Sequence, residues 1–224
     1  VEKAFTLALG EQAARLHWLR SGAQACGVRN GYEQPEKLGA DRWAALIGAR
    51  ALHGAAALVV TSGTATTADV LDGAGVFQGG VILPGLDLMR SSLARDTAQL
   101  PFADGRFEPL PRRTADAIVS GCLHAQLGAI ERMYAKAATE EPAAICMLTG
   151  GAAHRLAPCL GVPCRVEETP RLHRVWPPVR HVRIGSQGMA YPHDVVMRRI
   201  GLAVGVVSDP QLGQRMPRFE HERP

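Results

Sequence analysis

The sequence predicts an α/β fold up to about residue 166, and three observations support this prediction. Short apolar runs of strand length alternate with longer stretches of helical periodicity, as they do in α/β domains. Apolar residues make up 46% of the 224 residues, enough for a hydrophobic core. No apolar run approaches the roughly 18 residues of a membrane-spanning helix, so we expect no membrane partner. Beyond residue 166 proline is frequent and the periodicity is lost, so residues 167–224 are predicted as a divergent, unassigned tail.

The first 40 residues predict little regular structure. Glu11–Leu19 predicts a short helix or a passage from helix to strand. Gly27–Gly39 predicts a loop, because the pair Asn30-Gly31, together with Pro35 and Gly39, interrupts regular structure.

A helix is predicted from about Arg42 to Leu52. Asp41 stands at the capping position before it, and Gly54 ends it. Its apolar side chains share one face; they are Trp43, Leu46 and Ile47.

Three strands and a further helix are predicted next. Ala55–Thr61 has the composition of a buried strand. Ala68–Asp72 and Val76–Leu83 predict a hairpin around the turn Gly73-Ala74-Gly75. Pro84-Gly85 then begins a helical stretch that continues through Leu93.

The clearest helix runs from Ala115 to about Lys136, where apolar residues recur at helical spacing. Thr114 is predicted as its N-cap. Asp116 lies in the first turn, where a negative charge suits the helix dipole.

Charge and cysteine content exclude several classes of function. The net charge is +4, but the tail holds nine arginines against six acidic residues, so the body is close to neutral. We therefore expect no nucleic-acid partner for the body. The five cysteines show no CxxC spacing, and the eight histidines show neither HxxxH nor HxH spacing. This pattern predicts no metal site formed by protein side chains and a reducing, cytoplasmic location.

The segment from Asn30 to Trp43 is the first candidate for chemistry. It places Asp41 and Arg42 side by side at the start of a helix. The carboxylate can accept a proton from a substrate hydroxyl, while the guanidinium can hold an anionic group of the same substrate through a bidentate pair. The alternative interpretation is that Asp41 caps the helix and Arg42 pairs with it. The two interpretations are compatible, because a capping carboxylate keeps one free oxygen.

Two turns are candidates for nucleotide binding. Thr61–Thr67 combines a glycine with clustered hydroxyls, which suits phosphate oxygens, although threonine-rich turns are often structural. The strand Ala143–Leu148 runs into Thr149-Gly150-Gly151, and another helix opens near Ala152. The glycine pair there permits close approach of a nucleotide, and it equally permits an ordinary strand-to-helix turn.

The order of these motifs resembles that of the type III pantothenate kinases, a family that also contains proteins named Bvg accessory factor. The resemblance covers roughly residues 10–165. The matching stretches are Asn30-Gly31-Tyr32 with Pro35, Leu38–Trp43, Ser62–Thr67, Gly79–Gly85, Thr97–Pro101, and Thr114–Ile118 with Ser120-Gly121.

The resemblance implies an actin-like ATPase fold of two ribonuclease-H-like domains with a cleft between them, and a homodimer. Residues 1–54 would be a remnant of the first domain, residues 55–166 the second domain, complete or nearly so, and residues 167–224 the tail. The family phosphorylates the primary hydroxyl of pantothenate with ATP, the first step of coenzyme A biosynthesis. It uses Mg²⁺ and usually a monovalent cation, K⁺ or NH₄⁺.

The resemblance also implies roles for individual residues. Asp41 would be the catalytic base. Thr114 would contact pantothenate across the dimer interface. The other pantothenate contacts would be Tyr32, Gly39, Ala40 and Arg42, and the ATP contacts would be Gly63, Thr64, Gly150 and Gly151.

Three departures from the family pattern lead to two hypotheses. First, the D-x-G-N-T-type phosphate loop is absent, so we expect an internal, truncated member of the family. Second, Thr61 replaces the usual aspartate ligand of the monovalent cation. Third, residues 167–224 lack the family's closing motif. The first hypothesis is a pantothenate kinase whose activity the missing loop impairs. The second is a catalytically inactive member that acts in regulation or interaction, as proposed for Bvg accessory factors. A weaker option treats the arginine-rich tail as an arm for an anionic partner.

Overall fold

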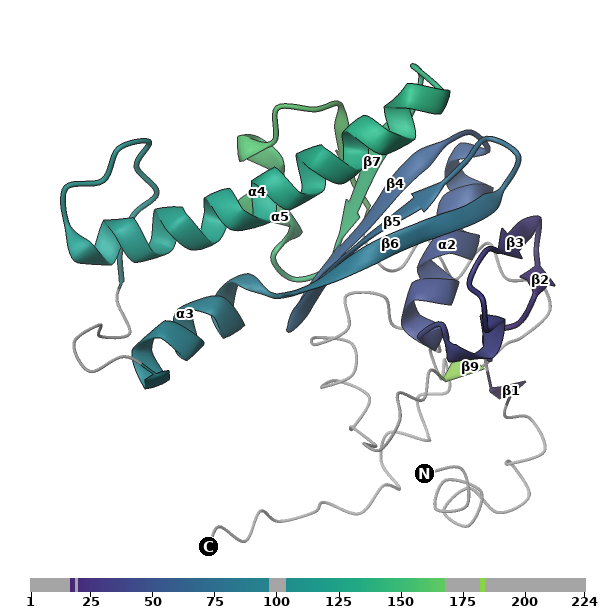
Figure 1. The fold of residues 1–224 in the computed structure, drawn as a ribbon, viewed down its shortest axis with the longest axis horizontal. Helices are drawn as coiled ribbons and strands as arrows, with labels where there is room; N and C mark the ends of the chain where they lie inside the picture. Colours follow the sequence, from purple (N-terminus) through teal and green to yellow (C-terminus); the bar gives the residue numbers. More distant parts are fainter. Residues whose placement is uncertain (1–16, 19, 97–103, 168–181, 184–224) are drawn as a thin grey trace, which may run out of the picture.

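The computed structural model describes residues 17–18, 20–96, 104–167 and 182–183 (Figure 1). Within the predicted stretch Glu11–Leu19, the described residues His17–Trp18 form a short strand, β1. This strand pairs in parallel with β9, Val182–Arg183, which belongs to the predicted tail. The rest of Glu11–Leu19 lies outside the described residues, as does the predicted tail apart from Glu167 and β9.

A seven-stranded mixed sheet organises the described residues. Its middle is an antiparallel meander of β4, β5 and β6. Strands β7 and β8 continue from β4 in parallel, and β3 runs parallel to β6 at the other side. The prediction of an α/β fold is therefore confirmed. From edge to edge the strands are β2 (Gln24–Ala25), β3 (Val28–Asn30), β6 (Val76–Pro84), β5 (Ala65–Leu71), β4 (Ala57–Ser62), β7 (Ile145–Thr149) and β8 (Cys164–Val166).

This sheet contains strands from both sides of residue 54. β2 and β3 precede that residue, and the other five strands follow it. The division into residues 1–54, 55–166 and 167–224, and the assignment of ribonuclease-H-like domains, stay predictions.

The hydroxyl-rich segment Thr61–Thr67, which was predicted as a turn, is mostly strand. β4 extends to Ser62 and β5 begins at Ala65, so only Gly63 and Thr64 connect them. Thr66 pairs with Ser62 across the hairpin, and Thr67 pairs with Thr61. β-branched residues favour strands, so the threonines lengthen the hairpin instead of forming a loop.

Helix α2, Ala40–His53, begins two residues earlier than predicted. Gly39 is its N-cap, and Asp41 lies in the first turn instead of capping the helix. A carboxylate in the first turn still interacts favourably with the helix dipole. Gly54 ends the helix as predicted: it adopts a left-handed conformation at φ 72°, and its N–H donates to the carbonyl of Arg50 at 2.9 Å.

The predicted loop Gly27–Gly39 contains regular structure that the composition did not indicate. Val28–Asn30 forms β3, and Pro35–Lys37 forms a turn of 3₁₀ helix. A three-residue strand is too short to show periodicity. Backbone pairing with β2 and β6 defines it instead.

Three helices follow the meander. α3 spans Leu86–Asp96, α4 spans Thr114–Glu140, and α5 spans Ala153–Leu156, with a 3₁₀ turn at Ala157–Cys159. Thr114 is the first residue of α4 and Arg113 is its N-cap, so the predicted capping by Thr114 is wrong. Asp116 lies in the first turn as expected, and its carboxylate accepts a hydrogen bond from the N–H of Arg106 at 2.9 Å.

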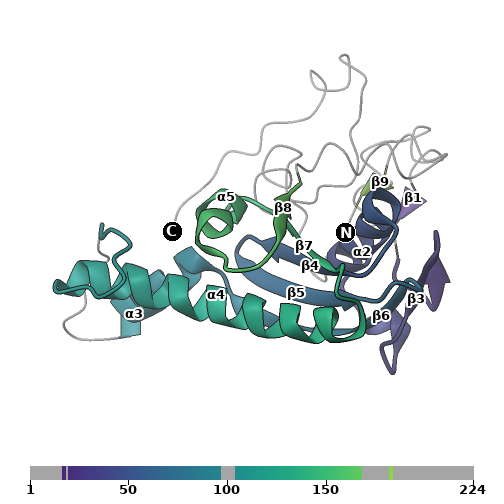
Figure 2. The same ribbon diagram turned by 90° about the horizontal axis from the view of Figure 1, so that it is seen from above.

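The sheet has a helix layer on each face (Figures 1 and 2). The alternation along β4 shows how one strand serves both cores. Leu58 and Val60 pack with α4 in one hydrophobic core, whereas Ala57 and Val59 pack with α2 in the other. Helices α3 and α5 join α4 on its face. Within the described residues, no helix has the length and hydropathy needed to cross a bilayer.

Candidate active site

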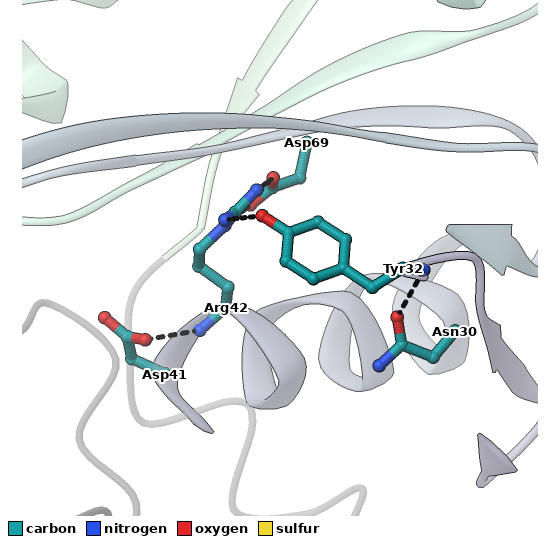
Figure 3. A network of polar contacts seen from close by, with 5 residues as sticks. All are labelled: Asn30, Tyr32, Asp41, Arg42 and Asp69. Carbon is teal, nitrogen blue, oxygen red and sulfur yellow. Dashed lines mark hydrogen bonds and ion pairs between the residues drawn. The ribbon is translucent and has the colours of Figure 1, made fainter. Parts of the chain in front are cut away.

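Asp41 sits in the first turn of α2 with one carboxylate oxygen engaged. Its Oδ1 accepts a hydrogen bond from the backbone N–H of Arg42 at 2.8 Å. The second oxygen, Oδ2, points away from the Arg42 guanidinium (Figure 3). A Cβ at Gly39 would lie 2.5 Å from Oδ1, so the missing side chain at Gly39 makes room for the carboxylate. Asp41 is half-buried, and a carboxylate oxygen such as Oδ2 can accept a hydrogen bond from a substrate hydroxyl.

Arg42 is buried beside a partner that the sequence did not suggest. Its Nε lies 3.1 Å from each carboxylate oxygen of Asp69 on β5, and its Nη2 also donates to Asp69 Oδ1. Its Nη1 donates to the hydroxyl of Tyr32 at 2.7 Å. The alternative interpretation, in which Arg42 pairs with Asp41, is therefore wrong: the ion pair joins α2 to β5 (Figure 3).

Aromatic rings and an asparagine complete this network. The guanidinium carbon of Arg42 lies 5.4 Å from the ring centroid of Tyr32 and 5.6 Å from that of Phe77, within cation–π distance. Asn30 accepts the N–H of Tyr32 at 3.1 Å and donates to the carbonyls of Gly22 and Pro35, each at 3.1 Å. These contacts fix the segment between β3 and α2 against the sheet.

Burial and charge act in opposite directions on the ion pair. Burial raises the pKa of Asp69, the Arg42 guanidinium opposes that rise, and the negative charge of Asp41 adds to it. For Arg42, burial by itself lowers the pKa, but the hydrogen bonds and charge of Asp69 outweigh burial, and the pKa is raised. The guanidinium therefore stays charged. Because Asp41 influences Asp69, the two carboxylates share one electrostatic environment.

A row of threonines continues from Asp69 toward the ends of the strands. Thr61 on β4 is in register with Thr67 on β5 and with Thr149 on β7. Thr67 lies two residues from Asp69 on the same strand, so both side chains project on the α2 face. The three neighbouring hydroxyls thus lie between the ion pair and the turns that follow β4 and β7.

The turns that follow β4 and β7 lie side by side at the carboxyl ends of these two strands. β4 and β7 are parallel neighbours, so their carboxyl ends lie side by side. The N–H of Ala152 donates to the carbonyl of Ser62 at 3.1 Å, and the N–H of Gly85 donates to the carbonyl of Thr64 at 2.8 Å. Gly150 has φ 97°, and a Cβ there would lie 2.9 Å from the backbone nitrogen of Ser62. The structure therefore brings together the predicted ATP contacts, Gly63, Thr64, Gly150 and Gly151.

Thr114 does not join these residues within one chain. It begins α4, on the face of the sheet opposite α2 (Figure 2). Thr114 lines an open groove of about 530 Å³ between α3 and α4. Most of the groove is apolar: its other residues are Met89, Ser92, Leu93, Ala117, Ile118, Gly121, Cys122 and Ala125.

Comparison with known proteins identifies the family. A family model described as "Type III pantothenate kinase" matches residues 2–136, which is more than half of the chain. The chain belongs to the type III pantothenate kinase family. The family predicted from the motifs is thereby confirmed.

Several relatives within this family are closely similar. The chain is 58% identical over 163 residues to a type III pantothenate kinase of Aromatoleum aromaticum, covering 73% of this chain and 67% of that protein. It is 57% identical over 155 residues to one from Azoarcus sp., covering 69% and 58%. A solved Campylobacter jejuni structure, described as a Baf family transcriptional activator, is 22% identical over 62% of each chain, with a TM-score of 0.43. The chain thus spans 67% of the length of the Aromatoleum kinase and 58% of that of the Azoarcus kinase.

The cofactors of the type III pantothenate kinases fit this chain to different degrees. The described residues contain no group of three or more histidine, cysteine, aspartate or glutamate side chains placed to hold a metal. Mg²⁺ does not need such a group, because in kinases it is usually bound by substrate phosphates and one or two carboxylates. At Thr61, where the family resemblance predicts a cation-binding carboxylate, the side chain is neutral, and both oxygens of the nearby Asp69 accept hydrogen bonds from Arg42. The monovalent-cation site stays a prediction.

Asp69 is the residue that sequence reasoning missed. It is an acidic side chain within an otherwise apolar and hydroxyl-bearing strand, and it is 1% exposed. A charge in a buried strand requires a partner, because an unpaired buried charge is costly. This signal was present in the sequence, but it does not reveal which of the chain's cations is the partner.

Proposed function

We propose that this chain transfers the γ-phosphoryl group of ATP to the primary hydroxyl of pantothenate. The product would be 4'-phosphopantothenate, and the reaction would be the first step of coenzyme A biosynthesis. Membership of the type III pantothenate kinase family supports this proposal. The observation that carries it is Asp41, held by one oxygen at the start of α2 with the other oxygen directed away from the Arg42 guanidinium.

In the proposed reaction Asp41 acts as a general base. As the substrate hydroxyl oxygen bonds to the γ-phosphorus, the bond from that phosphorus to the β–γ bridging oxygen breaks and ADP leaves. The hydroxyl proton passes to Asp41 Oδ2. Transfers of this kind depend mainly on positioning and charge stabilisation, with a smaller contribution from the base.

The other site residues would position the two substrates. Tyr32, Gly39, Ala40 and Arg42 would form the pantothenate site with Asp41: Gly39, Ala40 and Arg42 adjoin Asp41 in the chain, and Tyr32 is linked to it through Arg42. The turns at Gly63-Thr64 and Gly150-Gly151 would receive the nucleotide, since glycine lets the backbone approach phosphate closely. Bound Mg²⁺ would neutralise phosphate charge, entering with ATP as part of the substrate.

We further propose that the active form is a homodimer. Thr114 lies apart from Asp41 in one chain, on the rim of an apolar groove between α3 and α4. A second copy seated at this groove would bring Thr114 to the pantothenate site of its partner.

All five cysteines are free thiols, which supports the predicted cytoplasmic location.

The test is a coupled assay of ADP release with pantothenate, ATP and Mg²⁺. Asp41→Asn is expected to lower kcat by about 10²–10⁴-fold, the usual contribution of a general base. Asp72→Asn is the matched control, because Asp72 lies in the β5–β6 turn and accepts hydrogen bonds from Val76 and Gln78. Full turnover by Asp41→Asn would exclude Asp41 as the base. Binding of both substrates without turnover by the unaltered chain would instead favour the inactive regulatory member.

The homodimer has its own test, by mixing two impaired variants. Asp41→Asn and Thr114→Val damage different halves of a shared site, so a mixed dimer would hold one intact site. Partial recovery of turnover on mixing is the expected result. Sedimentation as a monomer, with no recovery on mixing, would reject the shared site.

A further inference from the structure

The ion pair between Asp69 and Arg42 is the most buried of those in the described part of the chain. Asp69 is 1% exposed and Arg42 is 5% exposed. Asp69 accepts from Nε and Nη2, the two nitrogens that form one bidentate edge of the guanidinium. Arg42 therefore cannot offer this edge to a substrate while the pair is intact. Its main contact is with the protein.

Gly80 provides the space that this pair occupies. Gly80 is directly opposite Asp69 in the β5–β6 register. A Cβ at Gly80 would collide with Asp69 Oδ1 and would lie 2.9 Å from Asp69 Cα. The Gly79-Gly80 pair belongs to the motifs that define the family resemblance, yet no role in the reaction follows from it. Gly80 has a structural role instead: because it lacks a side chain, the Asp69 carboxylate can lie against β6.

The ion pair between Asp69 and Arg42 is connected to the proposed base, Asp41, through the backbone. Arg42 follows Asp41 directly, and its backbone N–H is the donor to Asp41 Oδ1. The side chain of the same residue is held by Asp69 and Tyr32. A movement of the Arg42 side chain would therefore move the first turn of α2 and the N–H that orients Asp41.

We propose that Asp69 is a positioning residue for the phosphoryl transfer: it anchors the first turn of α2 to β5 through Arg42, and so sets the direction of the Asp41 carboxylate. This inference rests on the proposed function, in which Asp41 is the base. Asp69 itself touches neither substrate. Arg42 serves mainly as the connector between the two carboxylates, with Tyr32 as its second support.

The first experiment separates positioning from substrate binding by steady-state kinetics. Asp69→Asn keeps the size of the side chain but removes its charge, and a misplacement of about 1 Å costs about 100-fold in rate. We expect kcat to fall about 100-fold while KM for ATP changes less than about threefold, because the nucleotide turns lie elsewhere on the sheet. Asp72→Asn, the same substitution in the same hairpin, is expected to keep kcat within about twofold. A folded Asp69→Asn protein with unchanged kcat would overturn the proposal.

A second variant covers the case in which Asp69→Asn fails to fold. The double variant Arg42→Met/Asp69→Leu removes both charges, and apolar replacement of a buried ion pair is often neutral for stability. We expect it to melt near the temperature of the unaltered chain and still to lose kcat about 100-fold. If it folds and keeps kcat, the ion pair is only structural and the inference is wrong.

Amide hydrogen exchange gives a readout that needs no activity. The N–H of Trp43 donates to Gly39 in the first turn of α2, and the N–H of Gly54 donates to Arg50 at its end, both at 2.9 Å. In Asp69→Asn, exchange at Arg42 and Trp43 is expected to rise about tenfold, with Gly54 unchanged. Equal change at both ends, or no change relative to Asp72→Asn, would overturn the anchoring. If the unaltered chain shows no turnover, the proposed function fails, while this measurement still decides whether Asp69 orders the base.

Discussion

Both faces of the sheet pack their helices in an apolar core, and the α2 face adds a buried ion pair. On the α4 face the helices pack in an apolar core, and two buried side chains of α4 donate hydrogen bonds to carbonyls: Tyr134 to Ala144 and Gln126 to Pro84, each at 2.6 Å. On the α2 face an ion pair, Arg42 with Asp69, is enclosed among aromatic rings. Both faces use the same strands, because alternate residues point in opposite directions. One strand, β5, therefore contributes both to the apolar core and to the buried ion pair.

The largest expected effect on stability comes from breaking the charged contact. Arg42→Ala leaves Asp69 buried without its partner, which should lower the free energy of unfolding by about 3–5 kcal/mol. Urea unfolding followed by circular dichroism measures it. The matched variant is Arg95→Ala on α3, where the ion pair with Asp96 is exposed, and there we expect little change. Similar losses in the two variants would remove the distinction between the sites.

Cavity formation on the α4 face should come next. Ile130 is 0% exposed in the apolar core, and Ile130→Ala should lower the free energy of unfolding by about 2–5 kcal/mol. Unlike changes in the Arg42–Asp69 pair, this loss should leave kcat near that of the unaltered protein at temperatures where the variant is folded. A kcat loss as large as that of Asp69→Asn would show that the two faces are coupled.

Tyr32→Phe should give a smaller effect. It removes the hydroxyl that accepts from Arg42 Nη1 but keeps the ring that contacts Phe77. Loss of one hydrogen bond to a charged group is expected to cost about 1.5–3 kcal/mol at most. Thermal melting compares this variant with Arg42→Ala. A loss as large as that of Arg42→Ala would mean that Tyr32, and not Asp69, is the principal anchor.

Labelling of cysteine thiols should show the smallest effect, and it needs no substitution in the protein. Burial raises the pKa of Cys146 on β7 to about 12, whereas Cys26 is exposed. Cys26 should be labelled by a maleimide at pH 8, and Cys146 should stay unlabelled until the protein unfolds. Because the folded state holds the Cys146 proton more tightly than the unfolded state, this thiol contributes stability below about pH 9. That contribution is lost as the pH rises toward 12. Rapid labelling of Cys146 in the folded protein would contradict its place in the core.

Elements with a strong local signal were predicted well. The ends of α4 and of the buried β4, and the terminal Gly54 of α2, all lie within four residues of their predicted positions. The short strands β2 and β3 were missed, since their definition depends on hydrogen bonds to other strands and not on their own composition. Capping by Asp41 and Thr114 was misplaced, because shifts of one or two residues in a helix start do not change the periodic pattern.

For the candidate site, residue types alone made Asp41 and the two glycine turns candidates, since each depends on what a short segment can do chemically. The partner of Arg42 could not be found in this way: Asp41 is adjacent in the chain, while Asp69 is 27 residues away. Only the packing of α2 on β5 makes the distant carboxylate the nearer one to the guanidinium. The chemistry of short segments could therefore be predicted from the sequence alone. The tertiary structure decided which carboxylate pairs with Arg42, because a charge buried away from water requires a partner that the packing of α2 on the sheet brings within reach.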